Sequence, residues 1–153
     1  MIRKEKPVTL TKRQQIVLAA LACEPDAEFA PVQVQKLFFL IDENVSAHIG
    51  GKQFAFEPYD YGPFDPAVYS ELEALSRAGF VVIENPHKRG ERRYRLTHQG
   101  VLAGQQARAT LHSSAKDYLK RAAAWVRGLS FAELVGAIYK AYPLMREKSI
   151  FNG

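Results

Sequence analysis

One short segment of the chain gathers aromatic rings, carboxylates and prolines at a density typical of a binding surface or of a plug in a core. The segment runs from Phe54 to Pro66. Aromatic side chains supply large contact areas at a low entropic cost, and carboxylates beside them attract a basic partner. We therefore predict a protein-binding patch, whose members are Phe56, Glu57, Tyr59, Asp60, Tyr61 and Phe64.

The same segment also has a structural interpretation. The rings of Phe54, Phe56 and Tyr61 would fill the gap between the two neighbouring helices, while the prolines and Gly62 fix the turn. Alternate side chains can point inward and outward, so the two interpretations are compatible.

A second candidate cluster is basic and surrounds a predicted turn between two short apolar runs. Its members are Lys88, Arg89, Arg92, Arg93 and Arg95. In a DNA-binding protein these side chains would contact backbone phosphates. They would serve equally well to hold an acidic protein, or to keep an exposed hairpin edge from pairing with other chains.

The helix predicted before this turn argues against base-specific reading of DNA. Residues 65–79 contain Asp65, Glu71 and Glu73 against one basic residue, Arg77. Phosphate repels a negatively charged helix at close range, and this helix offers few side chains that hydrogen-bond base edges. DNA contact would therefore fall to the basic turn.

Catalytic chemistry has little support in the chain. A metal site would require Glu57, Asp60 and Asp65 to hold a divalent cation by themselves. No glycine-rich phosphate loop, paired-histidine motif or nucleophile turn is present. Cys23 is the only cysteine and can form no internal disulfide, so we expect it to fill a position on a helix face. We predict a protein without enzymatic activity, cofactor or metal.

Charge is divided unevenly along the chain. The 153 residues carry a net charge of +5; residues 1–80 hold 8 Lys and Arg against 11 Asp and Glu, and residues 81–153 hold 13 against 5. The basic half would suit phosphate, an acidic partner, or the acidic half of a second copy in a homodimer. Because Met1–Lys6 lacks an apolar signal region and no long uncharged apolar run follows, we expect a cytoplasmic protein that does not enter a membrane.

Capping residues mark the predicted elements of the first hundred residues. Thr11 with Gln14 forms a capping box for one helix, and Pro31 suits the start of a second helix that ends at residues 50–51. Asp65 followed by Pro66 begins a third helix, which the glycine at position 79 closes. Short strands at residues 80–83 and 93–96 would form a hairpin with its tip at residues 88–90.

The remaining residues are predicted to be helical. Thr97 would cap a fourth helix, and either Ser113 or Ser114 a fifth. Ser130 and Glu133 form a capping box for the last helix, which the proline at position 143 terminates. We therefore predict a mainly α (α+β) fold in one compact domain. Residues 1–100 would form a winged-helix-like core with a small β-hairpin wing, and residues 101–153 a C-terminal helical extension packed on it.

Four stretches carry a resemblance to known bacterial proteins: residues 37–40 (LFFL), 56–63 (FEPYDYGP), 68–72 (VYSEL) and 96–100 (LTHQG). On these stretches the chain resembles the YwgA-like proteins and, more distantly, the Panacea antitoxin domain that includes SocA. The resemblance covers residues 12–143, and the Pro-Tyr-x-Tyr-Gly-Pro core is its specific part. Panacea domains usually read Tyr-Gly-Pro after a short apolar strand, so the fuller form here favours the YwgA-like branch.

The Panacea resemblance implies a non-enzymatic protein that neutralises a toxin by binding it, or presents a bound partner to a protease. Together with the patch, it predicts a binding module of bacterial or phage origin, antitoxin-like or regulatory, that forms a complex with a toxin or regulator. The alternative prediction is a winged-helix DNA-binding transcriptional regulator that uses its basic wing.

Overall fold

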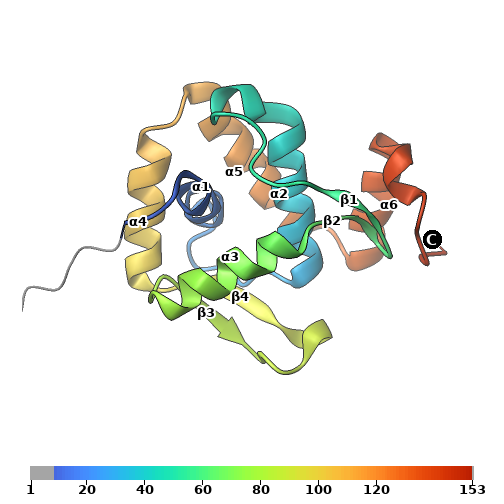
Figure 1. The fold of residues 1–153 in the computed structure, drawn as a ribbon, viewed down its shortest axis with the longest axis horizontal. Coiled ribbons are helices and arrows are strands. Elements are labelled where there is room, and N and C mark those ends of the chain that lie inside the picture. Colours follow the sequence, from blue (N-terminus) through green and yellow to red (C-terminus); the bar gives the residue numbers. More distant parts are fainter. Residues whose placement is uncertain (1–8, 153) are drawn as a thin grey trace, which may run out of the picture.

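The computed structural model describes residues 9–152, so the expectation about Met1–Lys6 lies outside the described residues. The helices are α1 (Lys12–Leu21), α2 (Pro31–Val45), α3 (Pro66–Arg77), α4 (His98–Ala109), α5 (Ser113–Gly128) and α6 (Phe131–Ala141). The strands are β1 (Glu57–Tyr59), β2 (Gly62–Phe64), β3 (Val81–Glu84) and β4 (Arg93–Leu96). Strands β1 and β2 form one antiparallel hairpin, and β3 and β4 form a second (Figure 1). The predicted mainly α (α+β) class is confirmed.

Local capping chemistry explains where most helices begin. The hydroxyl of Thr11 accepts a hydrogen bond from the Gln14 backbone at 3.1 Å, and the Gln14 side chain accepts one from Thr11 at 3.0 Å. Ser130 and Glu133 form the same reciprocal pair at the start of α6. Asp65 caps α3, with proline at its first position. These boundaries therefore follow from short-range hydrogen bonds that sequence spacing already specifies.

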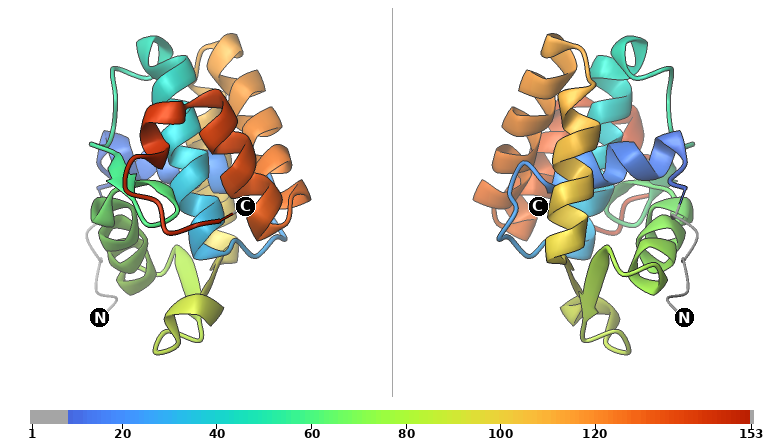
Figure 2. Two further views of the ribbon diagram at one scale, coloured as in Figure 1. Left: turned by 90° about the vertical axis from the view of Figure 1, so that its right-hand side faces the viewer. Right: turned by 90° about the vertical axis from the view of Figure 1, so that its left-hand side faces the viewer.

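Helix α2 lies at the centre of the core. Its consecutive residues Phe38, Phe39 and Leu40 are all buried, so the helix is covered on more than one face, as predicted. Helix α5 packs along α2, and α4 packs against α1 (Figures 1 and 2). Through Leu119 and Val126, α5 contributes fully buried side chains to the same hydrophobic core.

The hairpin β1–β2 was not predicted. Its register pairs Pro58 with Pro63 and Tyr59 with Gly62. Prolines lack the backbone donor and are depleted in strands, so the sequence pattern indicates only a turn here. Gly62 has a φ of 102°, a conformation that glycine adopts without strain, and this permits the tight reversal.

Three local predictions are wrong. Helix α2 ends at Val45 and not at residues 50–51, because the chain tightens there into a short 3-10 helix over Ser46–His48. The residue that caps α5 is His112, whose Nδ1 accepts a hydrogen bond from the Ser114 backbone at 3.1 Å, because Ser113 already lies inside the helix. Cys23 lies beyond the end of α1 instead of on a helix face, and its Sγ contacts the Ala19 carbonyl at 3.4 Å. Burial raises the pKa of the Cys23 thiol.

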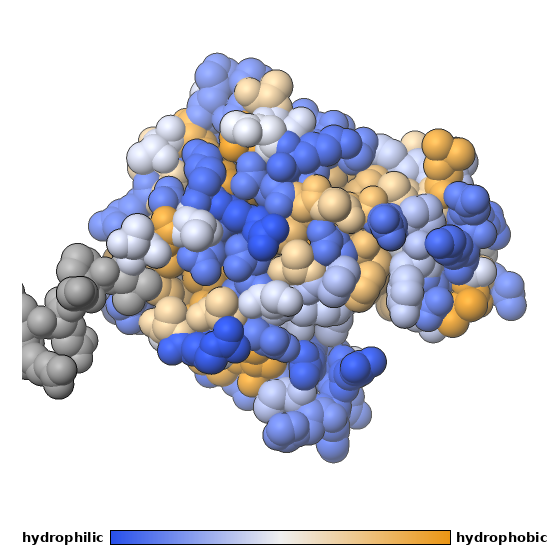
Figure 3. All heavy atoms as spheres, viewed as in Figure 1, coloured by the Kyte–Doolittle hydropathy of each residue, from blue (hydrophilic) through white to orange (hydrophobic). Residues whose placement is uncertain are grey.

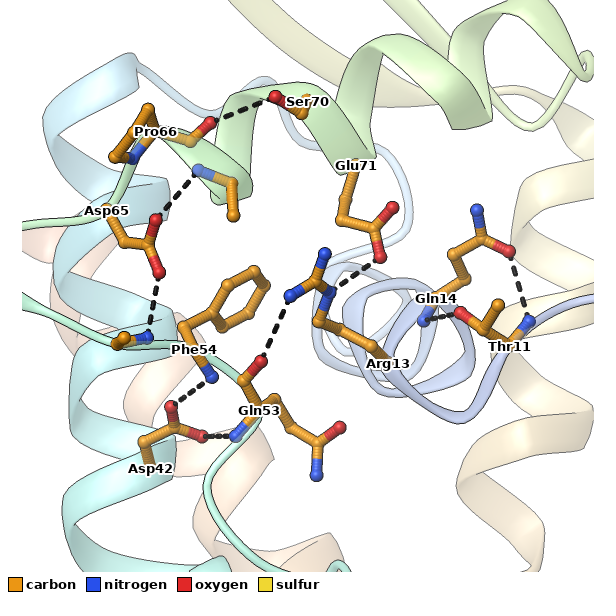
Figure 4. Close-up of polar contacts among 12 residues, drawn as sticks. Thr11, Arg13, Gln14, Asp42, Gln53, Phe54, Asp65, Pro66, Ser70 and Glu71 are labelled. Carbon is orange, nitrogen blue, oxygen red and sulfur yellow. Dashed lines mark hydrogen bonds and ion pairs between the residues drawn. The ribbon is translucent and has the colours of Figure 1, made fainter.

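Two buried carboxylates fasten the segment that leads into β1 (Figure 4). The carboxylate of Asp42 on α2 accepts hydrogen bonds from the backbone N–H groups of Gln53 and Phe54, both at 2.9 Å. The carboxylate of Asp65 accepts one from the backbone of Ala55 at 2.8 Å. The path of the chain before the hairpin is thus set by side chains from α2 and from the start of α3.

Asp42→Asn is expected to destabilise the protein by about 1–3 kcal/mol, because an amide has one acceptor oxygen and would turn its NH₂ group toward a buried N–H donor. Thermal unfolding measures the loss. Glu43→Gln is the control, since that carboxylate pairs on the surface with Lys52 at 3.2 Å and is expected to contribute about 1 kcal/mol or less. Equal melting temperatures for the two variants would contradict a structural role for Asp42.

Candidate functional site

A cavity of about 560 Å³ lies between the β1–β2 hairpin, the β3–β4 wing, the start of α2 and the start of α6; we call it the hairpin–wing cavity. Figure 3 shows the outline of the molecule hollowed between the wing, at the bottom, and the C-terminal part of the chain, at the right. Sites for small ligands have volumes of about 300–1,000 Å³. The cavity is therefore large enough for a ligand or for a few side chains of a partner.

Aromatic side chains from separate parts of the chain surround this cavity. Tyr59 stacks on Phe64 with 4.7 Å between ring centroids, and Phe64 meets Tyr69 of α3 edge-on at 5.8 Å. Tyr61 packs edge-on against Phe131 of α6 at 5.0 Å. Tyr59, Tyr61 and Phe131 nevertheless stay 51%, 40% and 44% exposed. These rings are preorganised by their mutual contacts and still accessible to a partner.

The residues of the predicted protein-binding patch divide into two groups. Tyr59, Asp60, Tyr61 and Phe64 line the hairpin–wing cavity. Phe56 instead packs toward the core, with its ring edge-on to Phe39 at 5.6 Å, and Glu57 is exposed outside the cavity. The structural interpretation thus holds for Phe54 and Phe56, which pack on Phe38 and Phe39, and is wrong for Tyr61, which lines the cavity and is 40% exposed. The binding interpretation stays a prediction for the residues at the cavity.

The C-terminal tail fastens the tip of the β1–β2 hairpin (Figure 2, left). The carbonyl of Asp60 accepts hydrogen bonds from the Ile150 backbone at 2.9 Å and from the Ser149 hydroxyl at 3.3 Å. Tyr139 of α6 donates to the same Ser149 hydroxyl at 2.6 Å. Because the opposed prolines of the hairpin provide no backbone donors, these tail contacts help to hold the aromatic rings in place.

The wing cations also divide into two groups. Arg89 and Arg93 border the hairpin–wing cavity, and neither forms an ion pair with any residue in the described range 9–152. The other three are paired with carboxylates of the protein itself: Lys88 with Glu91 at 3.7 Å, Arg92 with Glu73 of α3 at 3.6 Å, and Arg95 with Glu84 at 3.1 Å. Arg93 donates only to the backbone carbonyls of Gly90 and Arg92, at 3.4 and 2.6 Å. Two guanidinium groups without a carboxylate partner in the described range thus border the same cavity as the aromatic hairpin.

Sequence reasoning missed a buried lysine at this cavity. Lys36 of α2 is 3% exposed, lines the cavity, and donates a hydrogen bond to the Pro63 carbonyl at 3.4 Å. Burial lowers the pKa of Lys36 to about 7. A signal was available, since Lys36 is the one charged residue in the otherwise uncharged stretch 31–41, most of which is buried.

The carboxylates considered for a metal do not converge. Asp65 is buried as a helix cap, and within residues 9–152 no three His, Cys, Asp or Glu side chains are grouped as metal ligands. Among the same residues, no helix combines the length and the apolar character needed to cross a membrane.

No protein-family model matches the chain, and no curated protein matches it. The resemblance to YwgA-like proteins and to the Panacea domain therefore stays a prediction.

Proposed function

We propose that the protein is a non-enzymatic binding module of bacterial or phage origin, antitoxin-like or regulatory, which acts in the cytoplasm by holding a protein partner at the hairpin–wing cavity. One observation carries this proposal. The aromatic hairpin and the unpaired wing residues Arg89 and Arg93, which the sequence offered as rival sites, border one cavity. Exposed tyrosines beside arginines are the side chains that most often dominate binding energy at protein interfaces.

The geometry also changes the kind of partner that we propose. The sequence suggested a basic partner, drawn by carboxylates around the aromatic rings. Asp65 is instead buried as a cap and Glu57 lies outside the cavity. Asp60 is therefore the one carboxylate of the lining, against the three basic residues Lys36, Arg89 and Arg93. An acidic partner with apolar side chains complements this lining better.

Replacing Tyr59 and Tyr61 together with Ala is expected to reduce partner capture by at least about tenfold, because exposed anchor residues contribute about 2 kcal/mol or more each at an interface. Capture is measured with immobilised protein in an extract of the source organism, and bound proteins are quantified by mass spectrometry. Leu102→Ala is the matched control, because Leu102 is 48% exposed on α4, away from the cavity. Undiminished capture by a folded double variant would refute the proposal.

A DNA-binding regulator is the alternative function, and the wing that projects from the helices is the part that would contact DNA (Figure 1). Three of its five cations are held by carboxylates of the protein, so we expect only weak, sequence-independent binding. Titrations with random and native upstream duplexes at about 50 and 200 mM salt measure it. Replacing Arg89 and Arg93 with Ala should lower the salt slope by at most about one unit each.

Tight binding to the native duplex that survives competition from random DNA would overturn the protein-partner proposal.

A further inference from the structure

Lys36 places an amino group at the hairpin–wing cavity without an anion from the described part of the chain beside it. An ammonium group has three N–H donors, and among residues 9–152 the single acceptor of Lys36 is the Pro63 carbonyl at 3.4 Å. Within residues 9–152 its Nζ forms no ion pair. Buried charges in proteins are normally paired, because an isolated ion loses several kcal/mol of hydration energy. A ligand that supplies an anion would complete this arrangement.

All but one of the other charged features of the cavity are also positive. Arg89 and Arg93 line it, and so does the first turn of α2, whose N-cap residue Ala30 has no side-chain oxygen to accept from the helix. The positive end of that helix dipole therefore adds to the positive potential at the cavity, but it offers few direct donors, because Pro31 has no N–H and the Ala30 N–H donates to the Gln33 side chain at 2.8 Å. Asp60 is the one carboxylate among the lining residues, and it forms no ion pair in the described range.

The side chains that line the cavity also favour a ligand with an apolar part. Phe64, Tyr69 and Leu134 line the cavity and are half-buried or buried, so the ligand needs an apolar body beside its anionic group. The exposed rings of Tyr59, Tyr61 and Phe131 extend this apolar surface out toward solvent. A polypeptide would cover these rings together with the cavity, whereas a small free acid would leave part of them in water.

We propose that the hairpin–wing cavity receives the C-terminal residue of a partner polypeptide, with an aromatic or aliphatic last side chain between the aromatic walls and its terminal carboxylate paired with the Lys36 ammonium. This inference rests on the proposed function, since it names the part of the partner that is bound. Arg89 and Arg93 would attract the carboxylate at the mouth of the cavity.

The first test uses peptides. Acetylated tetrapeptides ending in Phe, Leu or Trp are titrated into the full protein, each with a free C-terminus and as its C-terminal amide. We expect the free acid to bind at least about tenfold more tightly than the amide, and Lys36→Met to remove this preference. Lys36→Met is expected to fold, because Met fills a similar space without a charge. Lys52→Met is the control, since Lys52 is an exposed lysine paired with Glu43.

Equal affinity for acid and amide, an acid preference that survives Lys36→Met, or no binding by any of the peptides would overturn the inference. Binding of 3-phenylpropionate as tight as that of the best peptide would also overturn it, and would identify a free acid as the ligand. If the peptide test fails while Tyr59→Ala with Tyr61→Ala still abolishes partner capture, the inference is wrong and the proposed function stands. If instead the capture test fails while the peptides keep a Lys36-dependent preference for the free acid over the amide, the proposed function is wrong.

A second readout separates ligand binding from a purely structural role of Lys36. At about pH 8, where Lys36 is mostly neutral, a carboxylate that pairs with it must draw in about one proton, which calorimetry in buffers of different ionisation enthalpy detects. The other titratable or charged groups that border the cavity or Gly62 beside it are Tyr59, Asp60, Tyr61, Tyr69, Arg89, Arg93 and Tyr139. No proton uptake on binding, or equal uptake by Lys36→Met, would contradict the pairing.

Discussion

Lys36→Met is expected to stabilise the protein at about pH 6 by several kcal/mol, with about 5 kcal/mol as the upper estimate. The wild-type protein must either bury an unpaired ammonium group or release its proton. Burial lowers the pKa of Lys36 from its ordinary 10.5 to about 7, and the side chain is only 3% exposed. Methionine has a similar length and no charge to desolvate, and the variant gives up only the long hydrogen bond to Pro63.

The sign of the pH dependence follows from which state binds the proton more tightly. Between pH 7 and pH 10.5 the unfolded chain keeps Lys36 protonated while the folded chain does not, so wild-type stability rises with pH across this window. The penalty is complete below the folded-state pKa and disappears as pH approaches 10.5. Lys36→Met lacks this contribution, so its advantage should shrink from about pH 7 upward.

Urea unfolding of both proteins at several pH values between about 6 and 10 measures this difference. Other groups, including Tyr69 and Tyr118, whose pKa values burial raises to about 12, are common to both proteins and cancel in the comparison. Lys52→Met serves as the exposed control and should show no such trend. A constant stability difference between wild type and Lys36→Met over the whole range would contradict a buried, titrating lysine.

A residue that destabilises its own fold is often retained for function, and the acid-binding role proposed for Lys36 offers such a function. The stability and binding experiments therefore test the same substitution for two opposite effects. Lys36→Met should be more stable than the wild type and less able to bind a carboxylate.

Gly104→Ala is expected to destabilise the protein by about 2–4 kcal/mol and to lower its melting temperature by about 5–15 °C. Gly104 lies where α4 crosses α1. A Cβ atom added there would overlap the carbonyl oxygen of Leu18 and lie 2.6 Å from the Cβ atom of Ala22. Carbon atoms in a packed core sit about 3.5–4.0 Å apart, so the two helices would have to separate.

The obstacle at Gly104 is backbone, which cannot rotate away as the end of a side chain can. Gly136→Ala is the matched control, because Gly136 lies inside α6 and an added Cβ atom there meets nothing within 4 Å. That substitution should stabilise the protein by up to about 1 kcal/mol through helix propensity. Thermal unfolding of both variants decides the matter, and a Gly104→Ala variant as stable as the wild type would show that α1 and α4 are less closely packed than described.

Much of the fold was predictable because it depends on interactions between residues close in sequence. The capping boxes at Thr11–Gln14 and Ser130–Glu133, and the proline that follows Asp65, each act within a few residues and mark three helix starts correctly. The mainly α class and the β3–β4 wing follow from periodicity in the same way. The β1–β2 hairpin escaped prediction because its strands are very short and proline-rich, and because side chains from α2 and contacts from the C-terminal tail hold it.

The sequence by itself determined where α1, α3 and α6 begin, the alternating pattern of the β3–β4 hairpin, and the members of an aromatic and a basic cluster. Only the tertiary structure decided that Tyr59 and Tyr61 share one cavity with Arg89 and Arg93, and that three wing cations pair with neighbouring carboxylates. It also decided that Lys36 is buried with no counter-ion from residues 9–152. Capping and periodicity act over a few residues along the chain. Charge pairing and burial depend on distances in space, which side chains far apart in sequence acquire only when the helices pack.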